Sequence, residues 1–337
     1  MEKIAFIIGE TFLYWNSIVL TLAVAAAICL FLFLYLRERN NGISAAFLIC
    51  GCLVTSLVFS RAVHWYCMAN AYESLEAALR NYTGGGFALM GVFAACALTA
   101  LLLRLLGIVR NLPFAFDCMA LGGGAGIALG RLACLFTAAD RGPVIEKLRI
   151  FPIVYPVTNA VTGVTEWRFA TFMIQAIVTG IIVLVLMIFH LNGQRGNRRK
   201  VRDGDTACLF LAFYGASQVV LDSTRYDSLF MRSNGFISIV QILGAAALIL
   251  TMIYFSVRMV KARRFQWWYI PVWLVYAGCA GGAGFMEYWV QRHGDQALFS
   301  YSVMTGCLVV MVILTCIVRL LAVTRERKKS VVETAKK

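Results

Sequence analysis

Ionisable side chains inside long apolar stretches are the residues of this sequence best suited to chemistry. Arg61 and His64 lie three residues apart, as do Asp222 and Arg225, so each pair would share one face of a helix. A charged group within a membrane costs about 2.5–3.5 kcal/mol, so each of these, and Arg131, needs a partner or a function. Since a guanidinium binds phosphate through parallel hydrogen bonds, the arginines predict a site for a phospholipid head group.

The position of Arg131 favours a packed environment for this side chain. It follows Gly122, Gly126 and Gly130, a row of small residues that lets a second helix approach closely. Close helix packing is the simpler interpretation of the row itself. Because Arg131 continues it, we expect this arginine to face neighbouring helices and to contribute to an anion-binding cavity on one side of the membrane.

Other polar residues in the apolar stretches have simpler interpretations. We expect Asp117 and Glu287 to be paired structurally or to reach the membrane interface. His64 is interpreted as a packed, satisfied histidine, although a role as a base stays open. Cys134 is interpreted as a buried, inert thiol.

The composition indicates which elements must position these residues. Of 337 residues, 61% are hydrophobic and 14% are charged, and the mean hydropathy is +0.77. Soluble domains are about a quarter charged, so this chain is predicted to be an all-α polytopic membrane protein. A helix needs about 20 apolar residues to cross the membrane, and about nine stretches qualify. They are 12–36, 43–69, 86–107, 113–136, 169–190, 206–223, 236–257, 268–289 and 300–322.

The net charge of +14 has an uneven distribution along the chain. Lysines and arginines concentrate in alternate connections and in the last residues. The connections are those near 37–39, 104–110, 195–202 and 258–264, and the tail is 324–337. The positive-inside rule makes that side cytoplasmic, with the N-terminus outside and the C-terminus in the cytoplasm. We therefore interpret the basic excess as orientation and attraction to lipid, and expect no nucleic-acid partner.

Eleven cysteines suggest neither a metal site nor a disulfide framework. Nearly all lie within apolar stretches, and no CxxC or paired histidine spacing is present. We expect no metal and no cofactor.

Several short motifs follow one another at defined intervals. Asp117 precedes Arg131 by fourteen residues, and the Gly130-Arg131 pair opens a segment that ends at Gly142. The order of these features resembles the prolipoprotein diacylglyceryl transferase family, over about residues 12–257. The residues that carry the resemblance also include Arg61, Gly84, Gly85, Arg168, Tyr214, Asp222, Arg225 and Gln241.

The resemblance implies a bacterial plasma-membrane transferase. Family members move the diacylglyceryl group of phosphatidylglycerol to the lipobox cysteine in the signal peptide of a prolipoprotein, and release glycerol phosphate. The implied catalytic residues are Arg131, Asp222 and Arg225. The implied substrate-binding residues are Arg61, Gly84, Gly85, Gly142, Arg168 and Tyr214. The partners are phosphatidylglycerol, the prolipoprotein signal peptide and membrane lipid.

Several positions of the family pattern carry other residues here. The family histidine is Leu89, its signature glutamate is Ala139, and the arginine after its Tyr-Gly pair is Gln218. Two alternatives therefore stay open: a catalytically altered relative that handles phospholipid without this reaction, and a membrane transporter.

The expected organisation follows from the extent of the resemblance. Residues 1–257 would form a seven-helix transferase-like domain, 258–323 two additional C-terminal membrane helices, and 324–337 a basic cytoplasmic tail.

Overall fold

The structure is a computed structural model, which describes most of the chain. The described residues are 4–8, 11–38, 41–68, 71–80, 86–145, 150–158, 163–194, 201–231, 234–293 and 296–335.

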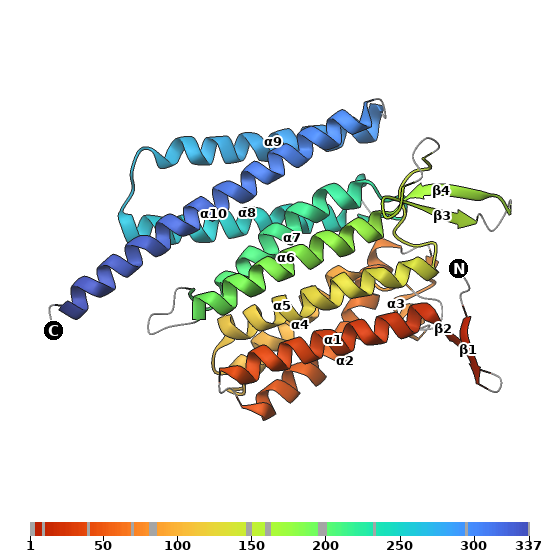
Figure 1. The fold of residues 1–337 in the computed structure, drawn as a ribbon, viewed down its shortest axis with the longest axis horizontal. Coiled ribbons are helices and arrows are strands. Elements are labelled where there is room, and N and C mark those ends of the chain that lie inside the picture. The colour runs from red at the N-terminus through yellow and green to blue at the C-terminus, as the bar shows by residue number, and fades with distance from the viewer. Residues whose placement is uncertain are drawn as a thin grey trace. The chain divides into compact units, whose positions relative to one another are not determined.

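Long apolar helices make up most of the described residues (Figure 1). They are α1 (Trp15–Arg37), α2 (Gly42–Cys67), α4 (Leu89–Leu105), α5 (Leu112–Arg131), α6 (Thr171–Gln194), α7 (Asp205–Ser223), α8 (Ile239–Arg263), α9 (Tyr269–His293) and α10 (Ala297–Ala335). Within the described ranges, eight helices are long and apolar enough to cross a membrane, and α4 is shorter, with 17 residues. This confirms the prediction of an all-α polytopic membrane protein, because lipid requires backbone polar groups to be paired within each segment.

Short elements complete the connections between the helices. Helix α3 (Leu75–Arg80) follows α2, and the 3₁₀ helix η2 (Leu132–Phe136) continues α5. Three antiparallel hairpins pair β1 (Ile4–Ile8) with β2 (Thr11–Tyr14), β3 (Val154–Thr158) with β4 (Thr165–Phe169), and β5 (Phe230–Met231) with β6 (Asn234–Ser238). The expected helical segments left the connection between η2 and α6 without a predicted element. The strands β3 and β4 form there because both contain β-branched and aromatic residues, which favour extended backbone.

The chain divides into two compact units. The first unit comprises Met1–Phe210 and Thr224–Val240, and the second comprises Leu211–Ser223 and Gln241–Lys337. This division follows contacts within the fold, whereas the expected boundary at residue 257 follows the family resemblance and stays a prediction.

In the first unit, the glycine row of α5 lies against α1 (Figure 1). A Cβ atom added to Gly122 would come within 2.8 Å of the Ala27 carbonyl oxygen, and one added to Gly126 within 2.8 Å of the Ala27 Cβ. Any larger side chain would therefore push the two helices apart. This confirms the interpretation of the row as a packing surface, and it anchors the end of α5 that carries Arg131.

Asp117 has a structural role inside the same unit. Its carboxylate accepts hydrogen bonds from the backbone nitrogens of Gly204, at 2.8 Å, and Ala207, at 2.7 Å, where α7 begins. The first turn of a helix has backbone N–H groups without partners inside the helix, and a carboxylate there satisfies them. Asp117 thus pairs structurally, as expected, and ties α5 to the start of α7.

In the second unit, α7 and α8 approach closely at two glycines. A Cβ atom added to Gly244 would lie 2.8 Å from the carbonyl oxygen of Gly215, so neither position has room for a side chain. Side chains then connect α9 and α10 to these helices. The Tyr276 hydroxyl donates to the Leu248 carbonyl at 3.0 Å, and the Tyr301 hydroxyl donates to the Ser223 carbonyl at 3.2 Å.

Candidate functional site

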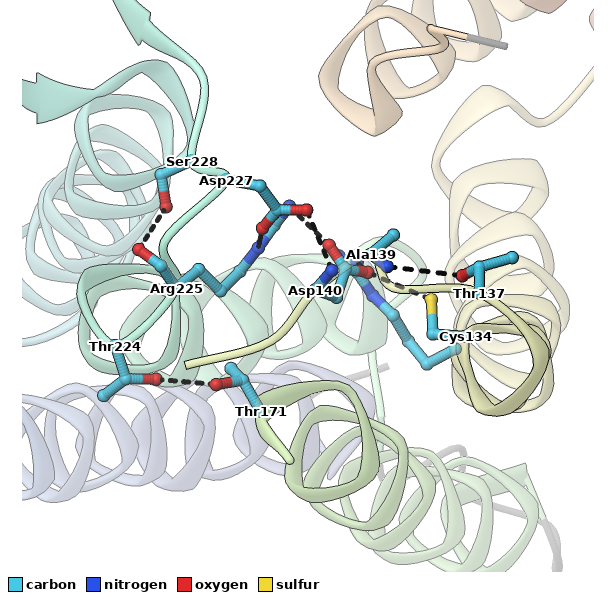
Figure 2. A network of polar contacts seen from close by, with 10 residues as sticks. Cys134, Thr137, Ala139, Asp140, Thr171, Thr224, Arg225, Asp227 and Ser228 are labelled. Atoms are coloured by element: carbon cyan, nitrogen blue, oxygen red, sulfur yellow. Dashed lines mark hydrogen bonds and ion pairs between the residues drawn. The ribbon is translucent and has the colours of Figure 1, made fainter. Parts of the chain in front are cut away.

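The strongest candidate site is a buried ion cluster around Asp140 in the first unit (Figure 2). One carboxylate oxygen of Asp140 pairs with Nη1 of Arg131, and the other pairs with Nη2 of Arg225. Asp227 extends the cluster, since its Oδ1 accepts from Nε of Arg225 at 3.1 Å and its Oδ2 accepts from the backbone nitrogen of Asp140 at 2.8 Å. We call Arg131, Asp140, Arg225 and Asp227 the Asp140 cluster.

The end of α5 brings Arg131 to this cluster. Helix α5 ends at Arg131, η2 adds one tighter turn, and the chain then reverses so that Asp140 returns to the arginine nine residues before it. Asp140 has a positive φ of 55°, a conformation that aspartate tolerates better than most residues. The reversal needs this conformation, which costs some backbone strain.

Gly142 fits a narrow space just after the reversal. A Cβ atom there would lie 2.8 Å from the Thr224 carbonyl oxygen and 2.9 Å from the Cβ of Phe169. The backbone nitrogen of Gly142 donates to the Phe169 carbonyl at 2.8 Å, and that of Tyr226 donates to the Arg141 carbonyl at 3.0 Å. The absence of a side chain at Gly142 therefore lets the segment before Arg225 come close to the segment that carries Asp140.

Arg141 holds the reversal in shape. Its guanidinium lies over the rings of both Tyr155 and Phe172, at 4.6 and 4.7 Å from their centroids. Its Nη2 donates to the carbonyl oxygens of Cys134 and Thr137, both at 2.9 Å. Only 2% of the side chain is exposed, and burial lowers the pKa of this guanidinium. Arg141 thus connects η2 to the β3–β4 hairpin and to α6.

The charges of the cluster are closely balanced. Burial acts to raise the pKa of Asp140, but the positive charges of Arg131 and Arg225 outweigh it and hold this pKa below its usual value. Asp140 is therefore ionised at neutral pH. The cluster contains two arginines and two aspartates, so an anionic ligand would have to join Asp140 on the guanidinium groups or displace it from them.

Two of the three predicted catalytic residues are brought together. Arg131 and Arg225 lie 94 positions apart in the sequence and meet on one carboxylate. Asp222 belongs to the second unit, near the end of α7, where only 1% of it is exposed. Its convergence with the two arginines stays a prediction.

Arg61 lies in a different environment on α2. Its Nε donates to the Ala78 carbonyl and its Nη1 to the Gly86 carbonyl, both at 2.7 Å. The guanidinium also stacks over the rings of Tyr72 and Phe87, at 5.0 and 5.4 Å. These contacts brace the connection between α2 and α4, and a substrate-binding role for Arg61 stays a prediction.

The other predicted substrate-binding residues are distributed over several elements. Arg168, on β4, pairs with Glu166 at 2.7 Å and lies 5.2 Å from the Tyr226 ring centroid. Tyr214 is buried in α7, within the second unit. Gly84 and Gly85 lie outside the described residues. None of these positions by itself tests a contact with substrate.

His64 and Cys134 each have a polar partner in the structure. Nδ1 of His64 lies 3.1 Å from the Tyr72 hydroxyl, which is consistent with a packed, satisfied histidine. Sγ of Cys134 donates to Oδ2 of Asp140 at 3.4 Å. Cys134 therefore lies next to the Asp140 cluster. Its thiol points toward an ionised carboxylate, which disfavours formation of a thiolate.

Sequence reasoning missed Asp140 and Asp227. Both lie in connections outside the expected spans, where a charged residue is common and does not by itself indicate a site. The family pattern has a glutamate at the position of Ala139, and the carboxylate one residue later was the signal that could have identified Asp140.

A family model described as prolipoprotein diacylglyceryl transferase matches residues 3–257. No curated protein sequence matches the chain significantly. The matched segment includes Arg131, Asp140 and Arg225 and extends through most of α8. Because it spans most of the chain, the protein belongs to the prolipoprotein diacylglyceryl transferase family.

Proposed function

We propose that this protein transfers the diacylglyceryl group of phosphatidylglycerol to the lipobox cysteine of prolipoproteins. The family is a transferase family, which supports an enzyme that acts on lipid and prolipoprotein substrates. The observation that carries the specific proposal is the meeting of Arg131 and Arg225 on Asp140 in a buried cluster. Two positioned guanidinium groups can stabilise the charge that develops on a departing glycerol phosphate.

The reaction requires a nucleophile, a leaving group and a proton acceptor. The acceptor thiolate attacks the glycerol carbon of the diacylglyceryl group, the carbon–oxygen bond to phosphate breaks, and glycerol phosphate leaves with the bonding electrons. Arg131 and Arg225 are proposed to bind that phosphate. A carboxylate with a lowered pKa is a weak base, so Asp140 is better suited to orient the arginines than to accept the thiol proton. We assign proton acceptance to Asp222.

A transfer assay with the purified protein tests this function. The protein is reconstituted with phosphatidylglycerol labelled in its acyl chains and with a lipobox peptide, and the peptide is analysed by mass spectrometry. We expect the peptide to gain one diacylglyceryl group and glycerol phosphate to appear in equal amount. A peptide with serine in place of the lipobox cysteine is the matched control. Phospholipid binding without any modified peptide would contradict the proposal.

A specific observation favours one alternative function. Leu89, Ala139 and Gln218 occupy positions where the family pattern has a histidine, a glutamate and an arginine. A relative altered at these positions would bind or handle phospholipid without transferring diacylglycerol. The same assay separates the two functions, because the altered relative would retain labelled lipid and leave the peptide unmodified.

We also propose that the protein lies in the bacterial cytoplasmic membrane with its N-terminus outside and its C-terminus in the cytoplasm. The support is the concentration of lysine and arginine in alternate connections. After Lys337, a reporter that works only in the cytoplasm should be active and one that works only outside should be inactive. Within 137–168 the two kinds of reporter should give the opposite result. Both reporters on the same side would contradict this topology.

The domain boundaries are proposed from the extent of the family resemblance. Residues 1–257 would form the transferase domain, 258–323 an addition of two membrane helices, and 324–337 a basic tail. The family match ends at residue 257, which supports an addition after it.

A further inference from the structure

The second unit contains an apolar groove between α8 and α9. Its volume is about 470 Å³, within the ~300–1,000 Å³ range of small-molecule sites. One wall is a helical face of α8 that includes Ile249, Ile253 and Val257, and the other wall is Trp273 and Tyr276 of α9. Helix α9 lies outside the family match, so this groove depends on the C-terminal addition.

The polar groups in the walls of the groove are used by the protein itself. Trp273 donates its indole N–H to the Ser256 hydroxyl at 3.1 Å, and Tyr276 donates its hydroxyl to the Leu248 carbonyl at 3.0 Å. The walls therefore present apolar surface along most of their length. Lys261, at the end of the groove, is exposed and has no hydrogen bond or ion pair among the described residues.

The length of the groove matches one leaflet of a membrane. From Ile249 to Lys261 there are twelve residues, which gives ~18 Å along a helix axis. Half of a ~30 Å hydrocarbon core is ~15 Å. An acyl chain in the groove would therefore bring the phosphate of its lipid to the level of the Lys261 ammonium group.

The charge near this end of the groove selects the kind of lipid. Arg258, Lys261, Arg263 and Arg264 lie within seven residues, and the sequence from Ile239 to Met286 contains no aspartate or glutamate. Lys261 is the member of this group that lines the groove, and it has no acidic neighbour in the sequence of α8 or of the first part of α9. An anionic head group would supply the missing negative charge.

We propose that the groove between α8 and α9 binds an anionic phospholipid, with one acyl chain between Ile253 and Trp273 and the phosphate on Lys261. The groove contains none of the residues proposed for diacylglyceryl transfer, and its α9 wall lies outside the family match.

Quenching of Trp273 fluorescence by brominated lipid tests the site in the full-length protein. The protein is placed in bilayers of brominated phosphatidylcholine, which quenches Trp273 when it occupies the groove. Unbrominated phosphatidylserine or unbrominated phosphatidylcholine is then added in steps, and each relieves the quenching as far as it replaces the brominated lipid in the groove. The emission of Trp273 is isolated by measuring each variant with and without Trp273→Phe. Phosphatidylserine is chosen because it is not the proposed transfer substrate.

We expect phosphatidylserine to relieve quenching of Trp273 about fivefold more effectively than neutral phosphatidylcholine, the effect of ~1 kcal/mol for one lysine near an anionic lipid. Lys261→Gln should abolish this preference, whereas Arg264→Gln, an equal charge change beside the groove, should retain it. Val257→Phe should reduce quenching of Trp273 by brominated phosphatidylcholine, because Val257 is an exposed part of the wall and a larger side chain there would fill the groove. Leu250→Phe is its matched control, exposed on the same helix but not in the groove.

Three results would overturn the proposal. These are equal effects of the two lipids on the parent protein, equal losses in Lys261→Gln and Arg264→Gln, and unchanged quenching in Val257→Phe. The second would indicate a diffuse surface charge effect. Because the quenching experiment does not measure diacylglyceryl transfer, its failure leaves the proposed function unaffected, and failure of the transfer assay leaves this site unaffected.

Discussion

Replacing Arg131 with alanine is expected to lower the rate of diacylglyceryl transfer by about 10²–10³-fold, the usual cost of losing a donor that stabilises developing charge. Arg131 lies in the buried Asp140 cluster, where its guanidinium is held by one oxygen of Asp140. Lysine should restore little activity, because an ammonium group cannot reproduce the planar fork of arginine. The measurement is initial transfer from labelled phosphatidylglycerol to a lipobox peptide, with each variant checked for thermal stability.

Cys134→Ala is the matched control for this prediction. Cys134 lies in η2, next to the same carboxylate, with its Sγ 3.4 Å from Oδ2 of Asp140. A thiol that donates to an ionised carboxylate is held in its protonated, unreactive form, so its removal should leave transfer nearly unchanged. An inactive Cys134→Ala variant together with an active Arg131→Ala variant would exclude the phosphate-binding mechanism and favour a thiol-based one.

Replacing Asp140 with alanine is expected to destabilise the protein by about 3–5 kcal/mol, because it leaves the guanidinium groups of Arg131 and Arg225 without their shared carboxylate in a buried site. Transfer should fall as well, since both arginines lose the group that orients them. Asp140→Asn preserves the shape of the side chain and removes its charge. It should therefore distinguish a loss of transfer caused by misoriented arginines from one caused by unfolding. The measurements are thermal unfolding in detergent and the transfer assay.

Asp227→Asn provides the control within the same cluster. Asp227 contacts only one of the two arginines, and 32% of its side chain is exposed, so the change should cost about 1 kcal/mol or less. An Asp227→Asn variant as unstable as Asp140→Asn would show that the bridge between the arginines is not what stabilises this region.

The same bridge predicts how stability depends on pH. The pKa of Asp140 is lower in the folded protein than its usual value of about 3.9. Its contribution to stability is therefore complete above about pH 4 and is lost as the pH falls through the lower, folded-state pKa. The parent protein should lose stability in this acidic range more steeply than Asp140→Asn. Parallel acid profiles of the two proteins would contradict this assignment.

Sequence reasoning recovered the elements because membrane helices follow local rules. The length and apolar character of each segment are set by the hydrocarbon thickness, so spans such as α1 and α7 could be predicted within a few residues. The glycine row of α5 was also interpretable, because residues four apart lie on one face of a helix wherever that helix packs. The β3–β4 hairpin was missed because its strands are short and their pairing is not a property of either strand alone.

By itself the sequence determined an all-helical membrane protein, the family it resembles, and Arg131 as a buried cation that needs a partner. Only the tertiary structure decided which partner that is. Asp140 reaches Arg131 through a chain reversal at η2, and Arg225 reaches Asp140 only because Gly142 allows two distant segments to come close. These two ion pairs depend on backbone conformation and on contacts between residues far apart in the chain. Neither can be predicted from the periodicity of the sequence. The bracing contacts of Arg61 were hidden for the same reason, since its partners are backbone carbonyl oxygens that any residue supplies.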